Sequence, residues 1–446
     1  MNIAVIGAGI SGLACAWQLA RAPGLRVSLL EADARLGGHT HTVEATVDGI
    51  THPVDTGFLV FNHRTYPNLV RLFDELGVPT AKSEMTFSVS LRDAGGVPTL
   101  EWAGTNLVTL FAQSRNLARP AFWRMAQEIV RFNREASALA GQHGEAASAS
   151  QSLGDYLDQN RYSQTFRDWY LLPMGAAIWS CPTAEMLAFP VATFTRFCLN
   201  HGLLQVADRP QWMTVAGGAR QYVEKLADAI RTQPGCAVRT SAGVTRVSRA
   251  AAGVNLVTAR GIEHFDQVVF ACHSDQALAL LEAPTSVERS VLAAVPYQTN
   301  HAVLHTDIAQ LPARRRAWAA WNFLGNSGKP GAIGNSKRPV AVTYLLNKLQ
   351  PLPFSTPLMV TLNPLTSPRT ETILQSIEYA HPVFNAAAIA AQARVPQIQG
   401  ADRLWFAGAW TGYGFHEDGL KSGLHVAHAI AALANSLSEP RLKNAA

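Results

Sequence analysis

The feature that most constrains this chain is a glycine-rich turn near its start, between a buried strand and a helix. Residues 1–6 form an almost continuous apolar run, which is typical of a strand covered on both faces. A helical stretch occupies 13–22, and a second apolar run, 26–30, ends on Glu31. Between the first strand and the helix stand three glycines at the spacing G-x-G-x-x-G: Gly7, Gly9 and Gly12. This order predicts a Rossmann-like dinucleotide-binding unit.

Each glycine has a physical task in such a unit. Gly7 makes the tight turn, Gly9 lets the backbone approach a pyrophosphate, and Gly12 lets the helix pack close to the sheet. The helix start, with Ile10 and Ser11, offers free N–H groups and the positive end of the helix dipole to the phosphates. We therefore expect these five residues to bind a dinucleotide, the alternative being a purely structural glycine turn.

Glu31 narrows the class of dinucleotide. Its carboxylate would accept hydrogen bonds from ribose hydroxyls and disfavour a 2′-phosphate, so FAD or NAD is expected rather than NADP. A second glycine pair follows in the segment Gly37-Gly38-His39-Thr40. Here the chain resembles the flavin-containing amine oxidase and phytoene desaturase superfamily, which usually has Arg or a small residue where His39 stands. The resemblance implies FAD, with residues 37–40 along its phosphates and ribityl chain.

Later segments extend the resemblance over roughly the FAD half of the chain. It implies that Gly57 and Phe58, in the run 54–62, lie beside the isoalloxazine ring, although this run also reads as a turn between strands. It places Val244 at the adenine. Near the end of the chain, the sequence predicts a buried strand, a glycine-rich segment and a helix from Leu420 to about Ala434. The resemblance implies that this region lines the flavin through Gly408, Ala409, Glu417, Asp418, Gly419 and Leu420.

Two departures bear on the chemistry. Amine oxidases of this superfamily commonly have an aromatic residue near the position where this chain has His416. They also commonly have a lysine in a middle strand, but the corresponding residues 300–303 include no lysine. His416 is the candidate catalytic residue as a proton acceptor, with a structural histidine as the alternative. The sequences of segments 55–58 and 414–419 resemble those of a bacterial group of predicted FAD oxidoreductases found alongside cyclopropane-fatty-acyl-phospholipid synthases. That likeness implies a fatty-acyl or other lipid chain as substrate.

Three functions follow from these observations. The first is an FAD-dependent desaturase or dehydrogenase of an apolar chain, the second an amine oxidase, and the third a non-catalytic FAD-binding module. Hydride transfer to a flavin needs no nucleophile or metal, and the sequence shows no serine elbow, metal cluster or thiol motif. The electron acceptor, flavin linkage and oligomeric state stay open.

Length and composition set the remaining bounds. A chain of 446 residues that is 48% hydrophobic is expected to form two domains. We predict an FAD-binding domain from 1–82, 206–275 and 394–435, a discontinuous α+β substrate domain from 83–205 and 276–393, and a flexible tail at 436–446. Within the substrate domain, 87–91 alternates like a strand with one solvated face, and 141–152 reads as an exposed loop.

Charge and cysteine usage indicate the surroundings of the protein. Five cysteines without a C-x-x-C pair indicate a reduced, cytoplasmic protein, and no apolar run is long enough to span a bilayer. The net charge of +5 is spread along the chain, and no nucleic-acid-binding motif appears. Basic and aromatic residues interleave, however, at Arg115, Arg119, Trp123, Arg124, Arg131, Arg314, Arg315, Arg316, Trp318 and Trp321. This pattern predicts either peripheral contact with the inner face of a membrane or an ordinary solvated face.

Overall fold

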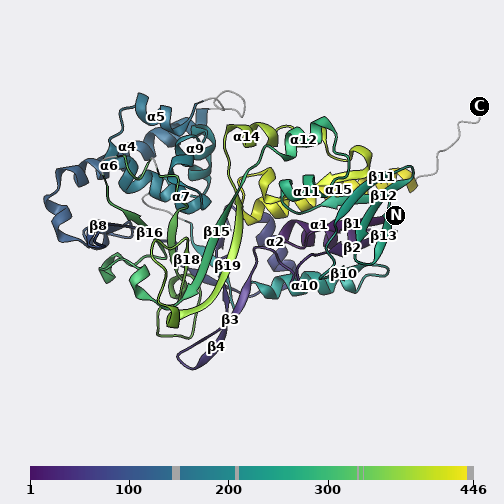
Figure 1. Cartoon of the computed structure of the whole chain (residues 1–446), viewed down its shortest axis with the longest axis horizontal. Coiled ribbons are helices and arrows are strands. Elements are labelled where there is room, and N and C mark those ends of the chain that lie inside the picture. Colours follow the sequence, from purple (N-terminus) through teal and green to yellow (C-terminus); the bar gives the residue numbers. More distant parts are fainter. Residues whose placement is uncertain (143–150, 206–209, 329–330, 335, 439–446) are drawn as a thin grey trace, which may run out of the picture.

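The computed structural model describes residues 1–142, 151–205, 210–328, 331–334 and 336–438, which form two lobes (Figure 1). One lobe contains the N-terminus and the last helix, and the other contains most of the segment between about 85 and 205. The chain crosses between the lobes several times, so each lobe is assembled from segments far apart in the sequence.

A parallel five-stranded sheet forms the centre of the N-terminal lobe. Its strand order is β10-β2-β1-β14-β20, and all four neighbouring pairs are parallel. The strands are β1 (Asn2–Ile6), β2 (Arg26–Leu30), β10 (Ala237–Arg239), β14 (Gln267–Phe270) and β20 (Leu404–Phe406). β1 lies in the middle with residues 3–5 fully buried, as predicted.

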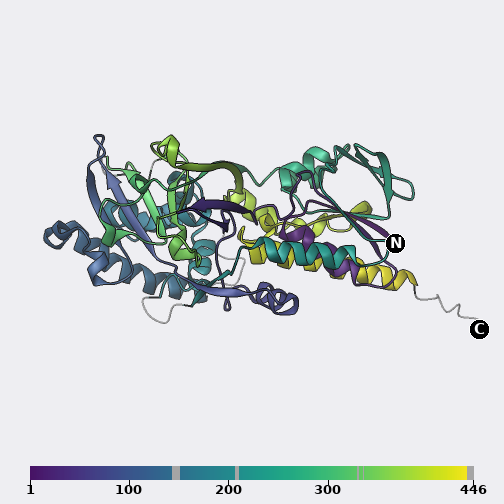
Figure 2. The same ribbon diagram turned by 90° about the horizontal axis from the view of Figure 1, so that it is seen from below.

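Two layers cover this sheet on opposite sides (Figure 2). The first consists of α1 (Ile10–Ala20), α10 (Arg220–Arg231) and α15 (His416–Ser438), and α1 packs against both other helices. The second consists of an antiparallel sheet and two helices: β11 (Arg246–Ala250), β12 (Gly253–Thr258), β13 (Gly261–Phe265), α11 (Ser274–Leu280) and α12 (Ser286–Leu292). This three-layer arrangement confirms the predicted Rossmann-like architecture.

The other lobe is organised around a seven-stranded sheet of order β19-β15-β18-β17-β16-β7-β8. Only the β16–β7 pair is parallel among its neighbours. The strands are β7 (Phe87–Arg92), β8 (Pro98–Ala103), β15 (Tyr297–His305), β16 (Trp321–Asn326), β17 (Ala341–Leu345), β18 (Met359–Leu362) and β19 (Ile373–Pro382).

The prediction that strand 87–91 has a solvated face is wrong. Ser88 and Ser90, its alternate polar residues, are fully buried. The Ser88 hydroxyl donates to the Asn322 side chain (2.7 Å), and the Ser90 hydroxyl donates to Glu101 (3.1 Å). The alternation therefore separates an apolar face from a buried polar one, because hydrogen bonds replace water on the polar side.

Helices cover one end of this lobe: α3 (Leu107–Leu110), α4 (Pro120–Gln142), α5 (Leu153–Gln159), α6 (Gln164–Phe166), α7 (Leu172–Trp179), α8 (Thr183–Leu187) and α9 (Val191–Asn200). α6 continues through a π-helical turn, Arg167–Leu171, into α7. The predicted loop at 141–152 begins as the end of α4, and 143–150 lie outside the described residues.

Smaller elements lie between the lobes. These are the hairpin β3 (Thr42–Val47) and β4 (Ile50–Asp55), helix α2 (Pro67–Leu76), and a small sheet of β5 (Phe61–Asn62), β9 (Trp212–Val215) and β6 (Thr80–Ser83). Two further short helices are α13 (Leu346–Leu349) and α14 (Ala386–Gln392). The domain boundaries drawn from the sequence stay predictions. The predicted tail begins inside α15, which extends to Ser438, and 439–446 lie outside the described residues.

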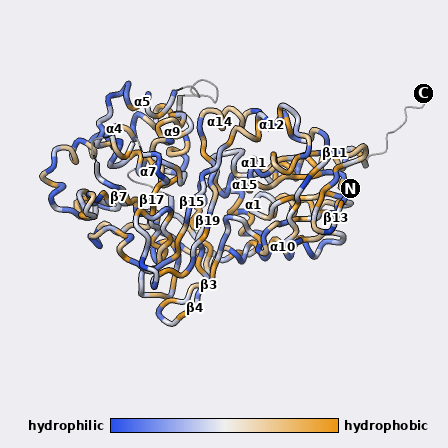
Figure 3. Tube along the Cα trace, viewed as in Figure 1, coloured by the Kyte–Doolittle hydropathy of each residue, from blue (hydrophilic) through white to orange (hydrophobic). Residues whose placement is uncertain are grey.

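Hydrophobic stretches are frequent around α1 and α15 in Figure 3, in agreement with the buried residues on both faces of the parallel sheet. The five cysteines, all in the described part of the chain, are free, and three of them are buried. Among the described residues, no helix combines the length and the hydropathy needed to cross a bilayer.

Candidate active site

The two glycine motifs meet at the carboxyl end of the parallel sheet. Gly9 and Gly37 form an isolated parallel bridge, and the Gly37 N–H donates to the Ala8 carbonyl (2.8 Å). A Cβ added to Gly38 would lie 3.1 Å from the Gly9 Cα. The second motif therefore runs directly over the first, at the edge where open parallel sheets bind their ligands.

The start of α1 fits a dinucleotide pyrophosphate. Gly9, the N-cap residue, contributes no side-chain cap, and a Cβ built on it would meet nothing within 4 Å. The N–H groups of the first turn, with Ile10 and Ser11, are thus left for a ligand. Gly12 has a packing task, because a Cβ there would lie 1.8 Å from the Gly7 carbonyl oxygen. The space beside Gly9 is the structural evidence that the site can take FAD.

Glu31 and the segment before β11 lie at the end of the site where the ribose and adenine were predicted. The Glu31 carboxylate accepts the Ala8 N–H (2.7 Å) and the Asp33 N–H (3.0 Å), which holds it beside the first glycine turn. The Ala242 N–H donates to the Glu31 carbonyl (2.8 Å). Val244, two residues on, is partly buried against the core that includes Leu30. The structure thus brings Glu31 and Val244 to the same end of the site.

The residues predicted beside the isoalloxazine ring also come together. The Phe58 N–H donates to the His39 carbonyl (2.9 Å), and Gly57 fits only without a side chain, since a Cβ would lie 2.1 Å from that carbonyl oxygen. The Phe58 ring stacks on His416, with centroids 3.9 Å apart. The Tyr222 hydroxyl hydrogen-bonds to both His416 Nε2 (2.6 Å) and Thr40 Oγ1. Burial lowers the pKa of His416 to about 3, so its imidazole is neutral.

A buried aspartate anchors this region to α10. Both oxygens of Asp55 accept the Ala219 N–H (3.0 and 2.9 Å), just before the helix starts. Burial raises the pKa of Asp55 to about 6, although hydrogen bonds from Thr42 and Ala219 oppose the rise. The Gln350 side chain pairs with both the N–H and the carbonyl of Asp55 (3.0 Å each). These contacts fix the chain that leads to Gly57.

A histidine cluster stands at the second glycine motif. The His39 ring centroid lies 5.3 Å from Tyr379, 5.2 Å from His381 and 6.1 Å from His273. His39 Nε2 is buried and has no hydrogen-bond partner among the described residues. Burial, with the neighbouring histidines, lowers the pKa of His39, and burial lowers that of His381 to about 4. His381 Nδ1 is in turn hydrogen-bonded to the Asn300 side chain (2.9 Å).

The two acids after His416 use their carboxylates within the protein. Glu417 accepts the Asn68 N–H (2.9 Å), the Asn68 side-chain amide (2.6 Å) and the Leu69 N–H (3.0 Å). Asp418 accepts the Phe415 N–H (2.9 Å), a bond that caps the N-terminus of α15. The helix therefore begins at His416, four residues before the start predicted at Leu420. The carboxylates of both residues thus cap helices, a role the sequence did not indicate.

The rest of the closing segment packs on the glycine turn. A Cβ on Gly419 would lie 2.9 Å from both Ile10 and Ser11, which means that α15 and α1 start side by side. Leu420 is fully buried. The Gly408 N–H donates to the Ser422 hydroxyl (2.9 Å), and the Ala409 carbonyl accepts the Gly412 and Gly414 N–H groups (3.1 Å each).

Several residues of the site were not predicted from the sequence. These are Tyr222, His273, Asn300, Tyr379 and His381. Tyr222 belongs to a helix with ordinary apolar spacing, and the others lie on strands or turns more than 200 residues from the glycine motifs. No local pattern marks them, because their role depends on which elements the fold brings to His39 and His416.

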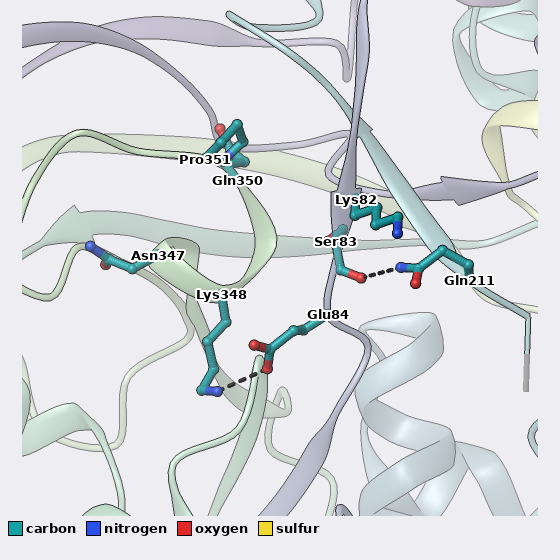
Figure 4. Close-up of a pocket in the computed structure, with 8 residues that line it drawn as sticks. All are labelled: Lys82, Ser83, Glu84, Gln211, Asn347, Lys348, Gln350 and Pro351. Carbon is teal, nitrogen blue, oxygen red and sulfur yellow. Dashed lines mark hydrogen bonds and ion pairs between the residues drawn. The ribbon is translucent and has the colours of Figure 1, made fainter.

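A separate cavity of about 380 Å³ lies between β6 and α13 (Figure 4). Polar residues line it, and the ion pair of Lys348 with Glu84 (2.8 Å) stands at one side. It contains no residue of the glycine motifs or of the closing segment. Among the described residues, no group of His, Cys, Asp and Glu is placed to hold a metal ion.

Comparison with known proteins agrees with this geometry. The model of the family "Flavin containing amine oxidoreductase" matches residues 10–332. A protein of Mycobacterium tuberculosis, "Putative flavin-containing monoamine oxidase AofH", is 26% identical over 357 residues, which are 77% of this chain and 70% of that protein.

Solved structures share the fold across both lobes. Cyclohexylamine oxidase from Brevibacterium oxydans IH-35A superposes with a TM-score of 0.68 at 18% identity, over 97% of this chain and 99% of that one. A fatty acid isomerase from P. acnes that produces CLA superposes with a TM-score of 0.62 at 15% identity, over 98% of each chain. With the glycine turn, the space at Gly9 and the family match in agreement, the chain belongs to the flavin-containing amine oxidoreductase family and is an FAD-dependent oxidoreductase.

Proposed function

We propose that the substrate is an apolar carbon chain, such as a fatty-acyl or other lipid chain, which the protein dehydrogenates. The observation that carries the proposal is the environment of His416. Phe415 precedes it in the sequence, the rings of Phe58 and Tyr222 contact it, and the two carboxylates that follow it are bound to backbone N–H groups.

The aromatic side chains continue from the closing segment into the helical part of the other lobe. Phe415 stacks on Phe197 of α9 (centroids 4.8 Å apart), and Phe197 contacts Trp179 of α7 (4.6 Å). Phe197 and Trp179 are buried, so Phe415 is the partly exposed end of an aromatic cluster. An apolar lining of this kind favours a hydrocarbon, whose burial is driven by the removal of apolar area from water. An ammonium group would have only cation–π contacts with these rings, because the carboxylates of Glu417 and Asp418 already accept backbone N–H groups.

The middle strand gives a second argument. In β15, Asn300 is fully buried, and its amide donates to His381 Nδ1 or to the Gln298 carbonyl, while its oxygen accepts from Asn363. No lysine stands in β15, where the related amine oxidases commonly have one. Neutral amides and an imidazole surround Asn300, which supports a substrate other than an amine.

The chemistry that FAD supplies in such proteins is the acceptance of a hydride from a substrate carbon. Dehydrogenation also releases a proton from the neighbouring carbon, and we assign His416 Nδ1 as its acceptor, since Nε2 is bonded to Tyr222. Because the pKa of His416 is low, the proton would be held there only transiently and would pass along the hydroxyls of Tyr222 and Thr40. The neighbouring aromatic rings would exclude water from this step.

The comparisons support two substrate classes. The name of the P. acnes structure gives a fatty acid as what that enzyme acts on. The names of AofH and of cyclohexylamine oxidase give amines instead. Amine oxidation is therefore the alternative that the experiment must separate from lipid dehydrogenation.

The test is anaerobic mixing of the FAD-loaded protein with candidate donors, followed by loss of the yellow absorbance of the flavin. We expect reduction by unsaturated fatty-acyl phospholipid and none by putrescine or cyclohexylamine. His416→Gln should slow reduction by about 10²–10⁴-fold. His425→Gln, which changes an exposed histidine on the same helix, is the control and should react like the wild type. Reduction by amines alone, or by no donor, would refute the proposal.

A further inference from the structure

Exposed hydrophobic side chains gather on one part of the surface. Five of the twelve large hydrophobic residues that are exposed in the described part of the chain lie within 107–130. We call these five the tip patch, and their exposed fractions are 73% for Leu107, 63% for Val108, 54% for Leu117, 46% for Trp123 and 63% for Val130. Single exposed hydrophobics are ordinary, but a cluster of this kind marks a contact surface.

Local contacts make the tip patch one continuous structure. The Trp123 indole N–H donates to the Leu117 carbonyl (2.9 Å), and Phe111, the C-cap of α3, packs on Trp123 with centroids 5.3 Å apart. Trp123 and Val130 are seven residues apart on α4, so they share one face of that helix. The segment 107–130, which carries the patch, lies at the end of the molecule opposite the N-terminus in both views (Figures 1 and 2).

Most of the charge around the tip patch is positive; Glu128, which lies between Trp123 and Val130 on α4, accepts hydrogen bonds from Ser163. No Asp or Glu occurs in 102–127 or in 308–320. The short turn 315–317 lies against α3 and β8 and brings exposed arginines to the patch. The buried Glu101 holds this turn in place, because it accepts the N–H groups of Ala313 and Arg314 and the Arg314 guanidinium. The exposed arginines of the region are Arg115, Arg124, Arg314, Arg315 and Arg316.

We propose that the tip patch docks on the surface of a bilayer that contains anionic phospholipids. Aliphatic and indole side chains would enter the interface while the surrounding arginines meet the headgroup phosphates. A nucleic acid would satisfy the arginines but leave Leu107, Val108 and Val130 in water. A second copy of the chain would bring like charges together. This docking does not depend on the proposed substrate, although it would turn the lobe that contains α4 and α9 toward lipid.

The test is co-sedimentation of the FAD-loaded protein with vesicles of phosphatidylcholine, with and without phosphatidylglycerol. We expect binding only to the anionic vesicles, and weaker binding at high salt. Leu107→Asp should weaken the vesicle affinity about tenfold or more. Arg124→Glu and Arg316→Glu should each weaken it by roughly fivefold or more.

Matched controls lie at the other end of the molecule. Ile262 in β13 is 70% exposed, and Arg260 stands two residues before it. Ile262→Asp and Arg260→Glu should bind vesicles like the wild type. Flavin content and the unfolding midpoint show that each variant is folded. Equal binding to both kinds of vesicle, equal loss in the controls, or an effect of the patch variants on dimer formation or DNA binding instead of vesicle binding would overturn the proposal.

Discussion

Glu417 joins the first turn of α15 to the start of α2, and replacing it with alanine tests what its carboxylate does. Helix α2 has no cap of its own, because Tyr66 at its N-cap makes no side-chain bond and Pro67 follows. The Glu417 carboxylate instead accepts the N–H groups of Asn68 and Leu69, the second and third residues of the helix. The cap thus comes from a residue almost 350 positions away.

The magnitude follows from these bonds. Loss of an N-cap costs about 0.5–2 kcal/mol, and the bond from the Asn68 amide to a charged oxygen is worth about 1.5–3 kcal/mol. The two ranges sum to about 2–5 kcal/mol. Since Glu417 is partly exposed and water can replace some of these bonds, we expect Glu417→Ala to lower the free energy of unfolding by about 2–3 kcal/mol.

The assay is urea unfolding of the flavin-free protein, in which the midpoints of the first transition are compared because a chain of two lobes need not unfold in one step. Glu44→Ala is the control: Glu44 is about half exposed in its ion pair with Arg220, so its loss should cost less than about 1 kcal/mol. If Glu417→Ala left the flavin-free stability unchanged and weakened only FAD binding, the carboxylate would serve the cofactor, and the capping argument would be refuted.

Two further predictions concern the cofactor and pH. Gly9→Ala should weaken FAD binding, measured by flavin titration, by about tenfold or more. It should leave the flavin-free stability within about 0.5 kcal/mol, because the added Cβ meets nothing within 4 Å. Gly12→Ala should fail to fold, because its Cβ would lie 1.8 Å from the Gly7 carbonyl oxygen. The stability of the flavin-free protein should fall as pH drops from 6.5 toward 5, since unfolding lets histidines that the fold keeps neutral take up protons: His41, His201, His305, His381 and His416. Asp55 and Asp418, whose pKa values burial raises to about 6, release protons on unfolding in that range and offset only part of the effect. Urea midpoints that do not change between pH 7 and pH 5 would contradict this.

The sequence by itself determined the cofactor half of the molecule. The apolar run 1–6, the glycine spacing and Glu31 are local patterns, and each has one physical solution: a buried parallel strand, a tight turn and an acid at the strand end. Local sequence predicts these features well because the residues that make them are neighbours in the chain.

Only the tertiary structure decided what surrounds the reacting end of the site. Tyr222 reaches Thr40 and His416 from α10, His381 reaches His39 from β19, and Glu417 caps α2. The polar face of β7 is likewise dry because Asn322 and Glu101 cover it. Each of these roles depends on a partner distant in the chain, and hydrogen bonds formed across such distances leave no periodicity or spacing by which a sequence could reveal them.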